Sequence, residues 1–211
     1  MKIAASLTEP SGVHRAVLDG ADVIEVRLDL FPDDPVRGAA SVRALTDLPI
    51  IATLRSVQEG GKFMGDPDRW AEIVSAVLPY ADYVDIEARF QEHAELVKDA
   101  GKTIIASAHV PDMPALPELF TLERMLRSFG DIPKIAVMPA TLDDVINLIS
   151  FTHAAAKPVC TSIMGAEFRN IRGVLPLFGS EFVYCHVGQP ASHGQYSVAE
   201  FRELARLMGM E

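Results

Sequence analysis

Short apolar segments alternate with segments of helical periodicity along the whole chain. Apolar runs of this length, rich in Val and Ile, predict β-strands. Eight of them occur, at residues 2–6, 22–30, 49–55, 83–88, 103–109, 134–140, 158–164 and 182–187. The segments between them predict helices at 11–18, 34–45, 66–78, 91–100, 116–129, 142–156 and 198–208, and the least regular one follows Gly173, where Pro176 and Gly179 interrupt it. A strand followed by a helix, repeated without a linker, is typical of a parallel α/β domain.

The repeat favours one closed (β/α)8 TIM barrel over residues 1–211, as a single α/β catalytic domain. The alternative is an open doubly wound sheet, which usually has a glycine-rich first turn. The first turn here reads SLTEPSG and contains no GxGxxG motif. We therefore expect a barrel whose functional side chains lie at the C-terminal ends of its strands.

The segment 22–30 alternates strictly between charged and apolar residues. Glu25, Arg27 and Asp29 share one face of the predicted strand, because side chains alternate with period two. In a barrel the apolar face packs against the helices, so the charged face would point into the interior. A strand at a solvent-exposed edge would show the same alternation, so this strand alone leaves both interpretations open.

Other predicted strands also carry polar residues on one face, which favours the barrel interior. The additional residues are Thr53 with Arg55, Asp85 with Glu87, Ser107 with His109, and Lys134 with Ala136 and Met138. Buried charges are costly unless they are paired. We therefore expect Glu25, Asp85 and Glu87 to pair with Arg27, Arg55 and Lys134 around an active site.

Two of these residues have properties suited to catalysis. His109 ends a strand, and a histidine at the barrel mouth can accept and return a proton near neutral pH. Lys134 shares a strand face with small and flexible neighbours. An amine in an apolar pocket near another cation has a lowered pKa and attacks carbonyl groups. An exposed lysine at the start of a strand is the alternative interpretation of the same pattern.

Two long glycine-bearing loops, 55–63 and 188–196, are suited to ordering over a ligand. Arg169 and Arg172 follow the seventh predicted strand. An arginine at that position can bind a substrate carboxylate through two hydrogen bonds. These loops therefore predict a pocket for an anionic small molecule.

Composition excludes several classes of function. The 19 Lys and Arg residues against 29 Asp and Glu residues give a formal charge of −10, which argues against binding to nucleic acid or an anionic membrane. No apolar run is long enough for a membrane span, and the N-terminus does not read as a signal peptide. Cys160 and Cys185 show no metal-ligand spacing and are expected to be reduced thiols. We expect a soluble cytoplasmic protein.

With these residues in place, the chain resembles the type I 3-dehydroquinate dehydratases, the Schiff-base-forming dehydratases of the shikimate pathway. The similarity extends along nearly the whole chain. It rests on the segments Glu25-x-Arg27-x-Asp29, Arg55-Ser-x-x-Glu59-Gly60-Gly61, Asp85-x-Glu87, a strand ending at His109, Lys134 to Met138, Met164-Gly165 with Arg172, and Gly194-Gln195.

The resemblance implies a lyase that removes water from 3-dehydroquinate by syn elimination, giving 3-dehydroshikimate. Lys134 would form the Schiff base, His109 would transfer the proton, and Glu59 would orient His109. The substrate-binding residues would be Glu25, Arg27, Arg55, Met164, Arg172, Ser192 and Gln195. The resemblance implies no metal or organic cofactor, and it predicts a homodimer.

The last loop departs from the family pattern, because Ala191 stands where the family usually has serine. Ser192 replaces that hydroxyl only if the loop shifts slightly. Two other functions remain open from the residues alone. One is a metal-dependent hydrolase or isomerase that uses the carboxylates and His109 as ligands; the other is a barrel that binds a carboxylate ligand without catalysis.

Overall fold

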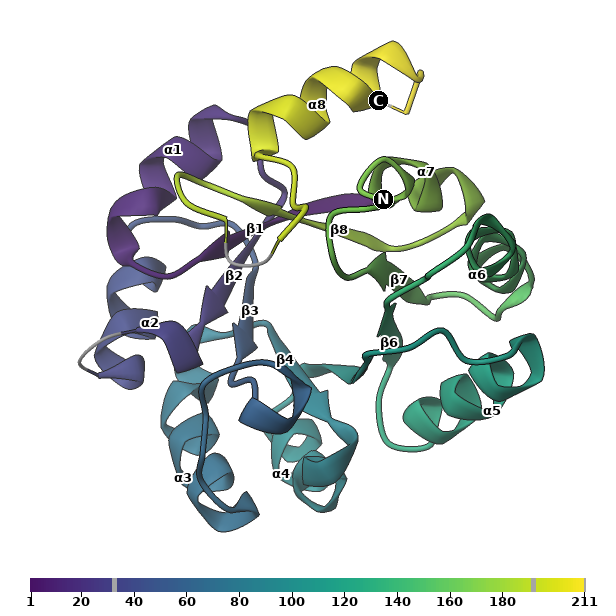
Figure 1. Ribbon diagram of the computed structural model, residues 1–211. Helices are drawn as coiled ribbons and strands as arrows, with labels where there is room; N and C mark the ends of the chain where they lie inside the picture. Colours follow the sequence, from purple (N-terminus) through teal and green to yellow (C-terminus); the bar gives the residue numbers. More distant parts are fainter. Residues whose placement is uncertain (32–33, 191–192, 211) are drawn as a thin grey trace.

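The computed structural model describes residues 1–31, 34–190 and 193–210. Eight parallel strands form one sheet in the order β7-β6-β5-β4-β3-β2-β1-β8, and Figure 1 looks down into the ring that they make. The strands are β1 (Lys2–Leu7), β2 (Val23–Arg27), β3 (Ile50–Thr53), β4 (Tyr83–Glu87), β5 (Thr103–Val110), β6 (Ile132–Val137), β7 (Cys160–Ile163) and β8 (Phe182–His186).

The ring closes between β7 and β8 through residues that immediately precede these strands. Val159 and Ser180 form a parallel bridge. The backbone N–H of Glu181 donates to the carbonyl of Val159 over 2.8 Å. The N–H of Thr161 donates to the Ser180 hydroxyl over 3.0 Å. The predicted (β/α)8 barrel is therefore confirmed.

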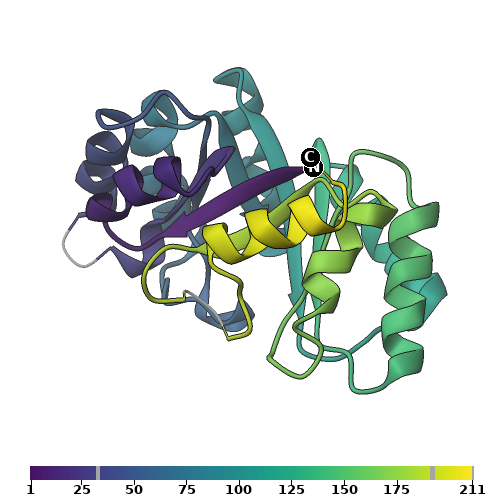
Figure 2. The same cartoon turned by 90° about the horizontal axis from the view of Figure 1, so that it is seen from above.

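The helices surround the ring, and Figure 2 shows the same arrangement from a second direction. They are α1 (Val13–Leu18), α2 (Pro35–Arg43), α3 (Pro67–Val77), α4 (Ala94–Asp99), α5 (Leu116–Arg127), α6 (Leu142–Ala154), α7 (Ile171–Val174) and α8 (Val198–Leu207). Side-chain caps fix the starts of four of them, at Asp34, Asp66, Thr141 and Ser197. No helix among the described residues is long and apolar enough to cross a membrane.

Two separate apolar regions support the barrel. The larger lies between strands and helices and contains the fully buried rings of Trp70, Phe90, Phe151 and Phe201. A smaller cluster fills the barrel interior and comprises Ala4, Val23, Ile51, Ile105, Ile132, Cys160, Phe182 and Tyr184. We call this second set the barrel plug. Because most of its members come from early positions in their strands, it leaves the interior open only toward the C-terminal ends.

Three differences from the predicted element boundaries bear on the site. β2 ends at Arg27, and Leu28–Leu30 forms a 3-10 turn instead of continuing the strand. β6 begins at Ile132, so Lys134 is an interior strand residue rather than its first residue. α7 contains only Ile171–Val174, since a 3-10 turn that includes Pro176 replaces its continuation.

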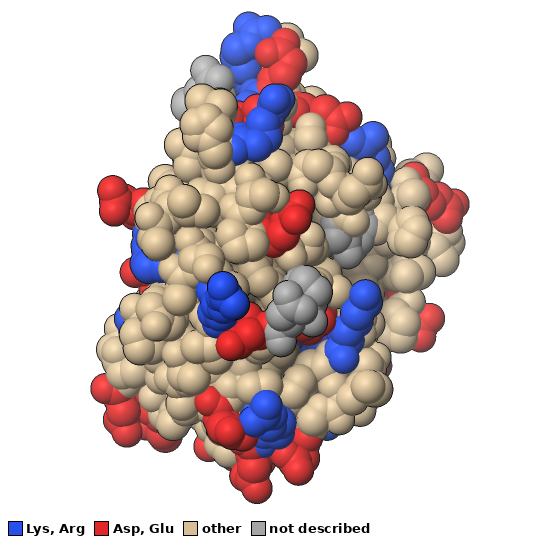
Figure 3. All heavy atoms as spheres, turned by 90° about the vertical axis from the view of Figure 1, so that its left-hand side faces the viewer, with Lys and Arg blue, Asp and Glu red and all other residues tan. Residues whose placement is uncertain are grey.

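The outer surface carries most of the charge. On the face shown in Figure 3, acidic and basic side chains lie scattered among uncharged residues. By contrast, the side chains of Arg27, Lys134 and Arg172 are buried. Glu25, Asp85 and Glu87 are buried as well, so the interior contains charges of both signs.

Candidate active site

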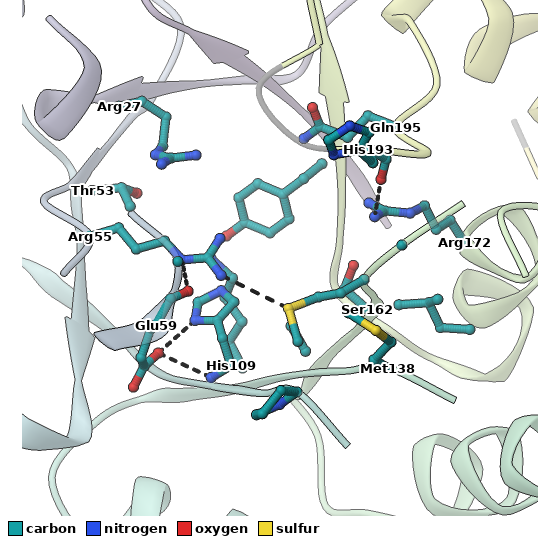
Figure 4. Close-up of a pocket in the computed structure, with 18 of the residues that line it drawn as sticks. Arg27, Thr53, Arg55, Glu59, His109, Met138, Ser162, Arg172, His193 and Gln195 are labelled. Carbon is teal, nitrogen blue, oxygen red and sulfur yellow. Dashed lines mark hydrogen bonds and ion pairs between the residues drawn. The ribbon is translucent and has the colours of Figure 1, made fainter. Parts of the chain in front are cut away.

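A cavity of about 770 Å³ opens at the C-terminal ends of the strands, above the barrel plug. Figure 4 shows Glu59, His109 and Arg55 on one side of it and Arg172, His193 and Gln195 on the other. Its wall includes nine of the ten predicted site residues, namely Glu25, Arg27, Arg55, Glu59, His109, Lys134, Met164, Arg172 and Gln195. The tenth, Ser192, lies outside the described residues, as does Ala191.

Lys134 reaches the cavity from the middle of β6 and is paired with Asp85 on β4. Its Nζ donates to Asp85 Oδ2 over 2.7 Å, and both side chains are buried. Ser107, on the strand between them, donates to the other carboxylate oxygen over 2.5 Å. Burial opposes the charge of this amine, but the carboxylates of Asp85 and Glu25 together raise the pKa of Lys134.

The expectation of a lowered pKa for Lys134 was therefore wrong for this structure. The strand pattern showed small neighbours and suggested an apolar pocket. The barrel instead places two carboxylates from other strands around the amine, and neighbouring opposite charges favour the protonated form. Lys134 is a buried cation at neutral pH until a reaction removes its proton.

His109, on β5, and Glu59, in the loop after β3, form a second, partly buried pair. Glu59 Oε2 lies 2.7 Å from His109 Nδ1 and also accepts the backbone N–H of His109 over 3.0 Å. Burial, reinforced by the charges of Glu87 and Asp85, raises the pKa of Glu59 to about 8. Burial and the nearby cations, Arg55 foremost, lower the pKa of His109 well below its usual value. The imidazole is thus neutral, and its Nδ1 is in contact with the carboxyl group of Glu59.

Two of the three carboxylates expected to pair with cations, Glu25 and Glu87, form no ion pair with the described residues. Glu25 accepts hydrogen bonds from the hydroxyls of Ser6 and Thr53, the latter over 3.0 Å. Glu87 accepts the backbone N–H of Ser56 over 2.9 Å. Hydroxyl and amide donors from adjacent strands lie closer to these carboxylates than the arginines do, because each arginine turns toward a loop.

Arg27 pairs with Asp29, two residues further along its own chain segment. Its Nε and Nη2 donate to the two carboxylate oxygens over 2.9 and 2.8 Å. The 3-10 turn after β2 makes this contact possible, since a continued strand would have separated the two groups along the same face. Asp29 therefore orients Arg27 and does not itself line the cavity.

Arg55 is held by the loop that follows β3. Its Nε donates to the backbone carbonyl of Glu59 over 2.8 Å, and its Nη2 lies 3.9 Å from Met164 Sδ. The loop turns back at Gly60, whose φ of +86° is accessible to glycine at little cost. Burial and the charge of Arg27 lower the pKa of Arg55.

Arg172 and Arg169 follow β7, but only Arg172 lines the cavity. Its Nη2 donates to the carbonyl of His193 over 3.1 Å, and its buried Nε has no partner among the described residues. Burial lowers the pKa of Arg172 to about 10. Arg169 instead stacks 4.2 Å from the centre of the Tyr196 ring and pairs with Glu200. Arg172 is thus the cation able to receive an anion.

Tyr184, Ser162 and His193 also line the cavity but were not predicted as site residues. For Tyr184, the period-two pattern of β8 contained a usable signal, because the inward face of a barrel strand also includes its aromatic residues. For His193, no sequence signal exists, since its backbone carbonyl rather than its side chain contacts Arg172. No group of three or more His, Cys, Asp and Glu residues in the described part of the chain is arranged to hold a metal ion.

Comparison with known proteins places this site in a family. The family model for type I 3-dehydroquinase matches residues 6–211. The chain is 54% identical to a 3-dehydroquinate dehydratase from Methanoregula boonei, over 99% of this chain and 100% of that protein. It is 38% identical to the enzyme of that name from Methanospirillum hungatei, over 99% of this chain and 81% of that protein.

Solved structures agree with the sequence comparison. The 3-dehydroquinate dehydratase from Aquifex aeolicus superposes with a TM-score of 0.85 at 27% identity, over 98% of both chains. The corresponding structure from Geobacillus kaustophilus has the same fold, with a TM-score of 0.89 at 24% identity over 99% of this chain and 91% of that one. The chain therefore belongs to the type I 3-dehydroquinase family.

Proposed function

We propose that the cavity dehydrates 3-dehydroquinate to 3-dehydroshikimate through a Schiff base on Lys134, as a step of the shikimate pathway. The observation that carries this proposal is the presence, in one cavity, of a buried lysine amine paired with Asp85 and a neutral His109 paired with Glu59. An amine and a nearby base are what a Schiff-base elimination requires. The chemistry uses no metal and no organic cofactor.

In the first step, Lys134 must lose its proton before it attacks. Asp85 Oδ2, at 2.7 Å, is placed to accept that proton. The nitrogen then forms a bond to C3 of the substrate. The carbonyl oxygen leaves as water, taking one proton from the attacking nitrogen and the other from Asp85, which becomes a carboxylate again. The resulting iminium is positively charged, so it keeps Asp85 as a counter-ion and withdraws electrons from the adjacent carbon.

In the second step, His109 removes a proton from C2, and the electron pair moves toward the iminium nitrogen. The same imidazole then gives a proton to the C1 hydroxyl, which departs as water. The carboxylate form of Glu59 accepts a hydrogen bond from Nδ1 and so leaves Nε2 to exchange the proton. Hydrolysis of the product imine releases 3-dehydroshikimate and restores the amine.

The remaining predicted residues would bind the substrate. Arg172 would take the carboxylate, since its guanidinium lines the cavity and its Nε has no partner among the described residues. Arg27, Arg55 and Glu25 would bind the ring hydroxyls. Met164 and Gln195 would cover the opening, together with Ser192, whose contribution stays a prediction.

The decisive experiment is borohydride reduction in the presence of 3-dehydroquinate, followed by peptide mass mapping. We expect a covalent adduct on the peptide that contains Lys134, and neither adduct nor turnover in Lys134→Met. Lys157→Met, at an exposed lysine outside the cavity, is the control and should behave like the unchanged protein. An adduct on another lysine, or turnover without any adduct, would refute the mechanism.

Further expectations rest on the composition of the chain and on the family resemblance rather than on the site. We propose that the enzyme acts in the cytoplasm and forms a homodimer, with 3-dehydroquinate as its small-molecule partner and no nucleic-acid or membrane partner. Light scattering coupled to size-exclusion chromatography tests the dimer, and fractionation of the source cells tests the location.

A further inference from the structure

Tyr184 is a cavity residue whose hydroxyl has no assigned task in the mechanism. It lies on β8, is 8% exposed, and lines the same cavity as Lys134. Its hydroxyl is buried, and no described residue forms a hydrogen bond with it. A buried hydroxyl without a partner costs free energy, so such groups usually have one.

The ring of Tyr184 is held in a defined position by its neighbours. Lys134 Nζ lies 4.2 Å from the ring centre, a cation–π distance. The ring of Phe182, in the barrel plug, lies 6.2 Å away, centre to centre. The phenol is therefore fixed between the ring of Phe182 and the reactive amine, which lies over its own ring.

The hydroxyl remains protonated and can donate. Burial, with smaller contributions from Cys160, Glu25 and Asp85, raises the pKa of Tyr184 well above its usual value. A ketone attached to Lys134 would bring the substituents of its neighbouring carbons to the side of the amine. In 3-dehydroquinate, the carbon next to the C3 carbonyl that carries an oxygen is C4.

We propose that Tyr184 is an additional substrate-binding residue, whose hydroxyl donates a hydrogen bond to the C4 hydroxyl of the bound ketone. This inference rests on the proposed function, because it requires the substrate to be attached at Lys134. It adds a recognition contact on the floor of the cavity, next to the reacting carbon. This hydrogen bond would favour substrates that carry a C4 hydroxyl, since a ring ketone without it would leave the Tyr184 hydroxyl without a partner.

The test compares two variants that each remove one tyrosine hydroxyl from the barrel. Tyr184→Phe preserves the ring, so folding and borohydride trapping on Lys134 should be unchanged. We expect kcat/KM for 3-dehydroquinate to fall about tenfold, the loss of about 1.4 kcal/mol. Tyr83→Phe is the matched control, because that hydroxyl lies 3.5 Å from Lys2 Nζ and does not line the cavity.

A second substrate identifies the contact. With an analogue that lacks the C4 hydroxyl, Tyr184→Phe and the unchanged enzyme should show the same kcat/KM. Equal kcat/KM of the two proteins on 3-dehydroquinate itself would overturn the inference, and a tenfold loss that persists with the analogue would overturn the assigned contact. An unchanged enzyme that neither turns over nor forms an adduct would instead refute the proposed function.

Discussion

Asp85 Oδ2 lies 2.7 Å from Lys134 Nζ, although the two residues are 49 positions apart and on strands that are not adjacent. The pair spans β5, whose Ser107 holds the same carboxylate. Both groups are inside the barrel, so each charge depends on the other for compensation. The reactive amine is thereby kept protonated at rest and has its proton acceptor already in contact.

Asp85→Asn should destabilise the fold and lower the pKa of Lys134. Removing one member of a buried ion pair costs roughly 3–5 kcal/mol, because the remaining charge is left uncompensated. The raised pKa of Lys134 contributes stability below its unfolded value and loses it as pH rises through the folded value. In the variant this alkaline loss should begin at lower pH. Urea denaturation between pH 7 and 11 measures both effects.

Glu203→Gln, in an exposed pair with Arg206, is the control for that experiment. It should leave the denaturation midpoint unchanged, because exposed ion pairs are screened by solvent. A midpoint for Asp85→Asn equal to that of the control would contradict the importance of the buried pair.

The pair of Glu59 and His109 predicts a rising limb in the pH–rate profile. With a Glu59 pKa of about 8, the carboxylate that directs Nε2 of His109 toward the substrate accumulates as pH rises through that value. Glu59→Gln should lower kcat by about 10²-fold, the scale of a general acid–base contribution, and should remove this limb. Steady-state kinetics from pH 6 to 9 tests it, and an unchanged limb in the variant would assign it to another group.

The raised pKa of Glu59 also affects stability, which should fall with rising pH while activity rises. The folded protein holds the Glu59 proton over the range from about pH 4.5 to about pH 8, where the unfolded chain has released it. The contribution of Glu59 to the free energy of unfolding should therefore decrease as pH rises through that window. In Glu59→Gln this decrease should be smaller, as measured by denaturation at matched pH values.

Arg172 and Arg169 offer a matched pair of substitutions three residues apart. Arg172→Gln should raise KM and lower kcat/KM by roughly 10²-fold, because a charge-assisted contact to the substrate carboxylate contributes about 1.5–3 kcal/mol. Arg169→Gln should change kcat/KM less than threefold, since Arg169 stacks on Tyr196 outside the cavity. Equal losses for the two variants would show that the effect belongs to the segment and not to the carboxylate contact.

Gly61→Ala should reduce activity by disturbing the loop that holds Arg55 and Glu59. An added Cβ at this position would lie 2.1 Å from the backbone carbonyl oxygen of Arg55, so the loop must shift. Gly101→Ala is the control, because its Cβ would meet no atom within 4 Å and only its φ of +69° is strained. We expect a kcat loss above tenfold for Gly61→Ala alone, at similar denaturation midpoints.

Prolonged treatment with a chelator should leave turnover unchanged. Arg27 and Arg55 lie among the carboxylates of the cavity and would repel a divalent cation. Loss of activity on chelation, restored by Mg²⁺ or Ca²⁺, would favour the metal-dependent hydrolase or isomerase. Tight binding of 3-dehydroquinate without turnover would instead favour a barrel that only binds a carboxylate ligand.

The sequence alone determined the barrel and most of its cavity. Strand length and the repeated helix pattern predicted the (β/α)8 fold, and the period-two alternation in segments such as 22–30 placed Glu25 and Arg27 inside. These signals are local, since they follow from backbone geometry and from the cost of burying charge. The polar face of a strand can therefore be predicted from its own sequence, without knowledge of the neighbouring strands.

Which polar group contacts which was decided only by the tertiary structure. Partner choice depends on strand register and on where each strand ends. Arg27 contacts Asp29 because β2 ends at Arg27. Lys134 is in register with Ser107 on β5, and both side chains contact Asp85 on β4. For the same reason, the pKa of Lys134 is raised in the structure, whereas the sequence pattern predicted a lowered one. Charges from distant segments act on a buried amine only after the barrel has closed around it.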